Sequence, residues 1–104
     1  MALRVIRLAA SLPRMREADI IARQLLRSAT SVGANYRSAC RARSRADFIS
    51  KIGVVEEEAD ETLYWLELLS ESKLVKPESI QGLITEVQEL VAIFTASGRT
   101  AKRR

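Results

Sequence analysis

Arginine side chains recur along the first half of this sequence at spacings that place them on one side of a helix. If residues 16–45 turn through about 100° per residue, the arginines lie within roughly 40° either side of Arg23. They are Arg16, Arg23, Arg27, Arg37, Arg41 and Arg45. Guanidinium groups are well shaped to contact phosphate or carboxylate oxygens. The pattern indicates a surface that meets an anionic partner, either nucleic acid or the acidic half of the same protein.

Charge is divided unevenly between the two halves of the chain. Residues 1–52 carry 11 Lys and Arg against 3 Asp and Glu, whereas residues 53–104 carry 6 against 10. This division favours either a nucleic-acid surface or self-association between oppositely charged faces. The plainer alternative is that both sets are the solvated faces of amphipathic helices.

The chain lacks the residues of most catalytic and metal sites. It has no histidine, so the commonest general base and transition-metal ligand are absent. The acids from Glu56 to Glu61 point in different directions on a helix and do not converge on a cation. Cys40 falls on the apolar side of the arginine-bearing helix and is interpreted as a small core residue. We therefore predict no enzyme activity, no metal and no cofactor.

Length and composition indicate one globular domain. A chain of 104 residues matches a single domain in size. With 4 glycines and 2 prolines it has few of the turn residues that an all-β fold requires. No stretch approaches the roughly 20 apolar residues of a membrane span. The single cysteine fits a reducing compartment, so a cytoplasmic location without membrane contact is expected.

Apolar residues spaced three and four apart predict four helices. They span about residues 2–12, 17–43, 45–72 and 77–97. Pro13 ends the first helix and Gly98 the last. Short connections between such helices predict an all-α, up-and-down four-helix bundle over residues 1–97, with a short first helix. Residues 98–104 are expected to form a basic, disordered tail.

Two local features bear on the arginine line. Gly33 lies in a run of poor helix formers, where a kink in the second helix is plausible on propensity grounds. Ser44 is a suitable N-cap for the third helix, with Asp47 three residues later. A break between Arg43 and Ser44 would remove Arg45 from the line.

The middle of the chain resembles a known family. Residues 24–48 read QLLRSATSVGANYRSACRARSRADF, and residues 56–69 read EEEADETLYWLELL. Both are similar to bacterial 23S rRNA intervening-sequence proteins, with an arginine, a Ser-(Val/Ile)-x-x-Asn stretch, a basic segment, and then Ser and Phe before a Glu-rich helix. The matching positions are Arg27, Ser31, Val32, Asn35, Ser44 and Phe48.

The resemblance implies a helical bundle that forms a ring-shaped homo-oligomer, a pentamer, and contacts nucleic acid. These implications come from similarity to the accessory proteins of diversity-generating retroelements, which contact a reverse transcriptase and nucleic acid. No reaction is implied. This chain has Gly33 where many members have proline, and its short first helix affects how the bundle closes at one end.

One hypothesis is that the arginine line binds RNA or DNA. Such binding would rest on phosphate contacts and depend steeply on salt. No aromatic residue interleaves with the arginines, and Tyr36 belongs to the apolar side, so a base-stacking platform is not expected. The candidate residues, which residues 102–104 would support, are Arg23, Arg27, Arg37, Arg41, Arg43, Arg45 and Lys51.

The alternative hypothesis is a structural or scaffolding protein whose arginines serve contacts with other subunits or a protein partner. A basic face and a separate acidic face on one subunit suit a head-to-tail ring. The candidate interface lies off the core side of the third helix. It comprises Val54, Glu58, Glu61, Trp65 and Leu68. Trp65 can equally cap the bundle core, and both interpretations stay open at this point.

Overall fold

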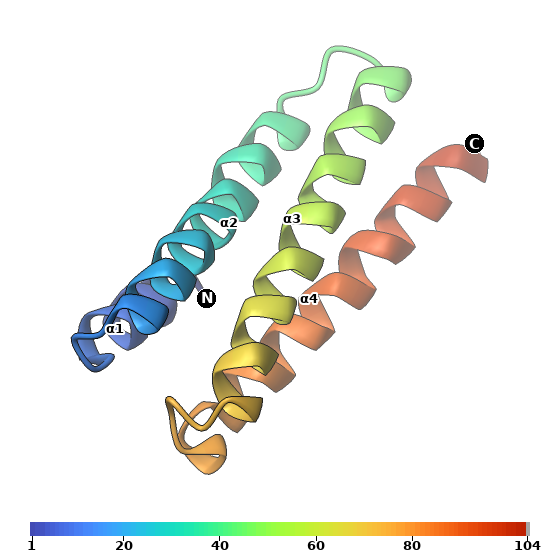
Figure 1. The fold of residues 1–104 in the computed structure, drawn as a ribbon. Coiled ribbons are helices and arrows are strands. Elements are labelled where there is room, and N and C mark those ends of the chain that lie inside the picture. The colour runs from blue at the N-terminus through green and yellow to red at the C-terminus, as the bar shows by residue number, and fades with distance from the viewer. Residues whose placement is uncertain (104) are drawn as a thin grey trace.

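Four antiparallel helices make up the protein, as a computed structural model describing residues 1–103 shows (Figure 1). They are α1 (Ala2–Ser11), α2 (Arg16–Cys40), α3 (Arg45–Glu71) and α4 (Pro77–Arg103). Each helix reverses the direction of the one before, and the molecule measures 47 × 20 × 18 Å. The predicted all-α, up-and-down arrangement with a short first helix is confirmed.

The connection between α2 and α3 is held by a reciprocal cap. The Ser44 hydroxyl accepts a hydrogen bond from the backbone N–H of Asp47 over 3.0 Å. The Asp47 carboxylate in turn accepts from the backbone N–H of Arg43 over 3.1 Å. The cap satisfies backbone donors that a helix start leaves unpaired. The predicted break before α3 is therefore confirmed.

Two helix ends differ from the prediction. α2 ends at Cys40 rather than near residue 43, because Arg41 leaves the helical region at φ −106° and ψ 18°. α4 continues past Gly98 to Arg103, so most of the predicted tail is helix. Gly98 does not adopt the positive φ of a helix-ending glycine, and it is buried where α4 packs against Ile52 of α3. Arg104, the last residue of the predicted tail, lies outside the described residues.

The core has two parts that differ in how many helices build them. Near α1 all four helices contribute, through residues such as Val5, Leu25, Leu66 and Val87. Farther along, only α2, α3 and α4 contribute buried side chains: Val32, Ala39, Ile52, Val55, Ala59 and Phe94. The reason is length, because the ten residues of α1 span about 15 Å and the 27 of α3 about 40 Å. The bundle therefore has three helices at the end away from α1.

A buried polar contact joins α2 to α3 near the middle of the bundle. The Thr62 hydroxyl donates to Ser28 Oγ over 3.0 Å, and Ser28 Oγ donates to the carbonyl oxygen of Leu25 over 3.2 Å. Both polar side chains are fully buried. Small side chains at this crossing allow the two helices to lie close together, and α2 runs unbroken through Gly33.

Candidate nucleic-acid interface

The arginines of α2 do not share one environment. Arg23 and Arg37 are exposed, and within residues 1–103 neither forms an ion pair with an acidic side chain. Arg27, midway between them, bonds two carboxylates of α3. Its Nη1 lies 3.0 Å from Glu58 Oε2, and its Nη2 bonds Glu61 Oε2. The predicted line is therefore interrupted at its centre by contacts within the chain.

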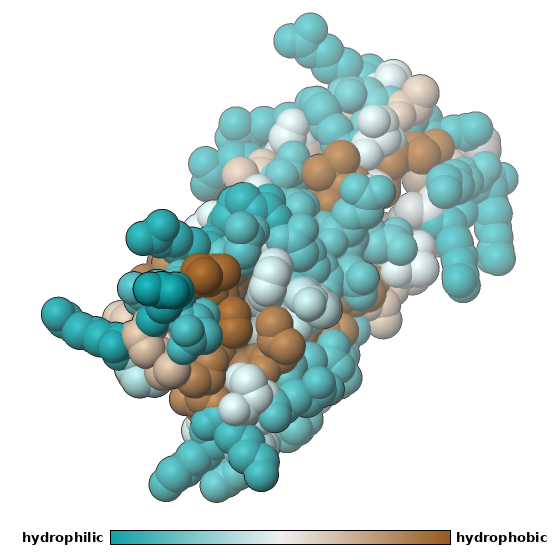
Figure 2. Space-filling view, in the orientation of Figure 1, coloured by the Kyte–Doolittle hydropathy of each residue, from teal (hydrophilic) through white to brown (hydrophobic). Residues whose placement is uncertain are grey.

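The partners of Arg27 belong to a small network on the α2–α3 face. Trp65 Nε1 donates to Glu61 Oε2 over 3.1 Å. This hydrogen bond, together with the guanidinium of Arg27, lowers the pKa of Glu61. Figure 2 shows that hydrophilic residues cover most of the visible surface over α2 and α3, with apolar residues gathered nearer the α1 end.

Three of the predicted interface residues, Glu58, Glu61 and Trp65, thus have partners inside the chain. Trp65 and Leu68 are half-buried and pack against the core near α1, whereas Val54 is 40 % exposed. Whether these residues also form contacts between subunits stays a prediction.

The remaining predicted cations gather where α2 ends and α3 begins. Arg41 caps α2, Arg43 lies in the connection, and Arg45 is the first residue of α3, all three exposed. Lys51 Nζ lies 3.1 Å from Asp47 Oδ2, one turn earlier on α3. The hydrogen bond from the backbone N–H of Arg43 is the main cause that lowers the pKa of Asp47, and the hydrogen bond from Lys51 lowers it further. Asp47 is therefore committed to local contacts and offsets one of the surrounding positive charges, that of Lys51.

The antiparallel arrangement brings the end of α4 to the same end of the molecule (Figure 1). A Cβ on Gly98 would lie 3.7 Å from Ile52 of α3, and Arg45 lines a hollow with Thr100 and Ala101 of α4. We call residues 37–51 and 99–103 the basic pole. It holds eight basic side chains against the single acid Asp47: Arg37, Arg41, Arg43, Arg45, Lys51, Arg99, Lys102 and Arg103.

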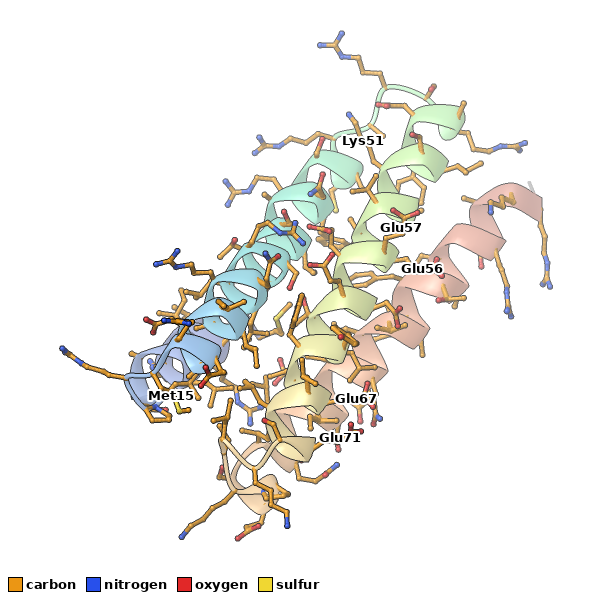
Figure 3. All side chains as sticks on the ribbon, viewed as in Figure 1. Met15, Lys51, Glu56, Glu57, Glu67 and Glu71 are labelled. Atoms are coloured by element: carbon orange, nitrogen blue, oxygen red, sulfur yellow. The ribbon has the colours of Figure 1, made fainter. Side chains whose placement is uncertain are left out.

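Acidic side chains occupy the next section of α3. Residues 52–66 carry five acids and no Lys or Arg. In Figure 3, Lys51 lies at the basic-pole end of α3, and Glu57 and then Glu71 follow toward the opposite end of the helix. One helix thus passes from the basic pole to an acidic middle.

Two residues near the basic pole differ from their predicted environments. Tyr36 is 46 % exposed, although it lies on the apolar side of α2, and its ring packs on Phe94 with centroids 5.7 Å apart. Cys40, predicted to be a small core residue, is exposed. Both lie toward the end where the core is built by three helices, and Met1 and Ala2 cover Tyr36 only in part. A hydrogen bond with the Cys40 thiol raises the pKa of the Tyr36 hydroxyl.

Neither a metal site nor a membrane-spanning helix is found among residues 1–103. Residues 1–103 contain no group of three or more Cys, Asp and Glu placed to hold a metal ion. None of the helices formed by these residues has the length and apolar character that crossing a membrane requires.

Residues 1–96 match the family described as 23S rRNA-intervening sequence protein. The chain belongs to this family. This member of the family is thus built from four helices with a capped connection and a basic segment between Arg37 and Arg45. The matched region ends before Arg99, Lys102 and Arg103, so part of the basic pole lies beyond it.

A solved structure supports the same relationship for this 23S rRNA-intervening sequence protein. It is the 1.70 Å crystal structure of a protein with unknown function from the S23 ribosomal protein family of Bacteroides thetaiotaomicron VPI-5482. The two share 37 % sequence identity with a TM-score of 0.84, over 91 % of this chain and 88 % of the other. Comparison with curated proteins found no match.

Proposed function

We propose that this protein is a non-catalytic homo-oligomer whose basic pole binds the phosphate backbone of RNA or DNA. The observation that carries the proposal is the convergence of two basic segments, far apart in sequence, on one end of the bundle. Eight basic side chains against one acid occupy one end of a molecule that measures 20 × 18 Å across its long axis. Charge of one sign at this density raises the local concentration of a polyanion and speeds its association.

Stabilisation of helix ends explains the presence of only some of these basic side chains. Cations favour the negative C-terminal ends of helices, so Arg37 in the last turn of α2 and Arg103 in the last turn of α4 also stabilise the fold. Arg43 and Arg45 lie instead at the N-terminal, positive end of α3, where a cation is unfavourable. Because these two cations do not stabilise the helix that carries them, contact with an external anion is a better explanation of their position.

Self-association is the second part of the proposal. The basic pole and the acidic section at residues 52–66 lie at different heights of one subunit, which suits a head-to-tail contact that closes into a ring. The number of subunits, five, rests on the family resemblance. Val54, 40 % exposed beside the acidic section, is a side chain that a neighbouring subunit would cover.

A scaffolding role without nucleic acid is the competing function. The observation that favours it is Arg27, which meets two carboxylates rather than solvent. On this view the arginines of the basic pole would meet acids of another protein in the same manner. The two functions differ in whether naked nucleic acid binds.

Electrophoretic shift of duplex DNA and structured RNA at low salt tests the proposal. Wild type should shift at least one of them, and R37E with R41E should weaken the shift. For duplex DNA, each lost phosphate contact should reduce the slope of log affinity against log salt by about 0.9. The matched control is R7E with R14E, the same charge reversal at the α1 end, which should leave binding nearly unchanged.

Three outcomes would overturn the proposal. Absence of a shift by wild type at low salt removes nucleic-acid binding and leaves the scaffolding role. An equal loss in both double variants shows a response to net charge rather than to the basic pole. Light scattering that finds only an 11.6 kDa species at micromolar concentration removes the oligomer.

A further inference from the structure

An apolar groove runs along α4 where α1 does not cover the bundle. It consists of two hollows of about 410 and 640 Å³, and Ile93 lines both of them. The one nearer α1 lies between α2 and α4, with Tyr36 and Phe94 in its walls. The other lies against the start of α3, between Phe48 and Ala101. Because Ile93 is shared, the two hollows form one continuous surface.

The groove has the dimensions of a helix-binding site. It follows α4 from Leu90 to Ala101, about 16 Å or three helical turns. Ile93, which lies where the two hollows meet, is 56 % exposed. Gly33 and Ala96 contribute almost no side chain to the walls, so another helix could pack at the 8–10 Å typical of helix pairs.

The charges around the groove select the kind of helix that fits. Arg45 lines the hollow that lies against the start of α3, and no acidic residue lines either hollow. Two acids of α4, Glu86 and Glu89, are close in sequence to the end of the groove nearer α1. Glu86 is already paired with the Met1 ammonium and with Arg4, which leaves Glu89. The far end of the groove lies within the basic pole and favours a partner with acidic residues there.

A second copy of this chain is a poorer match. Its α3 carries acids, but the apolar face of that helix, from Ile52 to Leu69, is buried in its own bundle. α1 exposes Leu3 at 67 % and Ile6 at 45 %, but it carries Arg4 and Arg7 and no acid. The end of α4 brings three further basic residues. Either helix would place cations of one subunit against those of the other, which is unfavourable at close range.

We infer that the groove binds an amphipathic helix of a protein partner, with apolar residues on one face and Asp or Glu on its flanks. Anchors at positions i, i+3 or i+4, and i+7 would contact Tyr36, Ile93 and Phe48 in turn, as in other helix-in-groove complexes. The carboxylates would face Arg45 and the basic pole. This goes beyond the proposed function, because phosphate binding uses the charges of the pole and not the groove.

A labelled synthetic peptide tests this inference by fluorescence anisotropy at near-physiological salt. The probe is a helix of about 12 residues with leucines on one face and glutamates on both flanks; a second peptide carries lysine in place of every glutamate. The glutamate peptide should bind wild type at least about tenfold more tightly than the lysine peptide, a factor worth about 1.4 kcal/mol.

Variants of exposed residues locate the binding. I93E should weaken the glutamate peptide at least about tenfold, and A96E, a second exposed groove residue, should weaken it as well. The matched control is I20E, whose isoleucine is 54 % exposed on α2 outside the groove; its affinity should equal that of wild type. Circular dichroism confirms that each variant is folded.

Four results would overturn the inference. They are no binding by wild type, equal affinity for the two peptides, unchanged binding by both I93E and A96E, and conversion of a wild-type oligomer to monomer by I93E, which assigns the groove to a second copy. The DNA shift separates this inference from the proposed function. I93E should keep that shift, and its loss in I93E would assign the groove to nucleic acid.

Discussion

Arg27 Nη1 lies 3.0 Å from Glu58 Oε2, across the contact between α2 and α3. The bond places the central arginine of the α2 line in a contact that holds the subunit together. Glu61 bonds the other terminal nitrogen and is itself held by Trp65. The arginines on either side, Arg23 and Arg37, have no such acid within residues 1–103, so the two groups should respond differently to substitution.

Arg27 should contribute to stability, and Arg23 should not. R27M removes the guanidinium that donates to both carboxylates. Methionine retains an apolar side chain of similar length and is a good helix former. We expect a lower Tm for R27M and little change for R23M, the matched exposed control on the same helix. Thermal unfolding followed by circular dichroism measures both. Equal melting temperatures for the two variants would contradict a structural role for the Arg27 contacts.

Replacing two of the helical glycines with alanine should stabilise the protein. Alanine is favoured over glycine inside a helix by about 0.5–1 kcal/mol. A Cβ at Gly33 would have no neighbour within 4 Å, and one at Gly98 would meet Ile52 at an ordinary 3.7 Å. G33A and G98A should each raise the free energy of unfolding in urea by about that amount. Destabilisation by G98A would show that α4 packs differently after residue 97.

Stability should decrease as the pH falls through the range in which carboxylates titrate. The hydrogen bond from Trp65 lowers the pKa of Glu61, and the Met1 ammonium lowers that of Glu86. Both pKa values in the folded state lie below the usual glutamate value of 4.5. The stabilisation is therefore complete above that pH and is lost as the two carboxylates are protonated.

The measurement is Tm as a function of pH. E61Q should have a shallower decrease between about pH 5 and pH 3 than wild type. E57Q is the control, since Glu57 is exposed and, among residues 1–103, forms no ion pair. A decrease of the same steepness in E61Q and wild type would show that Glu61 is not linked to folding.

The basic pole should open more readily than the α1 end. Its core is built by three helices and includes two alanines, whereas the core near α1 is built by four and includes four leucines among its buried residues. Local opening costs less where fewer apolar contacts are lost. Amide hydrogen exchange should therefore be faster around Ala39 and Ile52 than around Leu25 and Leu66. Uniform protection along α2 and α3 would contradict this.

The elements of the fold could be predicted from the sequence because each has a local signal. The three- and four-residue spacing of apolar side chains located the helices, and Ser44 followed by Asp47 located the start of α3. The end of α4 could not be predicted in this way. Gly98 is a common helix-ending residue, and only packing against Ile52 explains why the helix continues.

The candidate site was predicted only in part, because its geometry depends on tertiary contacts. Spacing alone placed Arg27 with Arg23, although α3 supplies Glu58 and Glu61 to Arg27 alone. The exposure of Tyr36 depends on where α1 begins relative to α2, which helical periodicity does not specify. The meeting of residues 37–51 with 99–103 does follow from an up-and-down bundle, provided the last helix is long enough.

Under the proposed function, the position of the basic pole would set the footprint of the molecule on a nucleic acid. A rod 47 Å long that is strongly charged at one tip has a large electric dipole along its axis, and it approaches a polyanion tip first. Standing upright, with a contact 20 Å across, each subunit covers about six base pairs at 3.4 Å per pair, whereas lying along the duplex it would cover about fourteen. Upright subunits would also leave the α1 end and the α3–α4 turn pointing away from the nucleic acid.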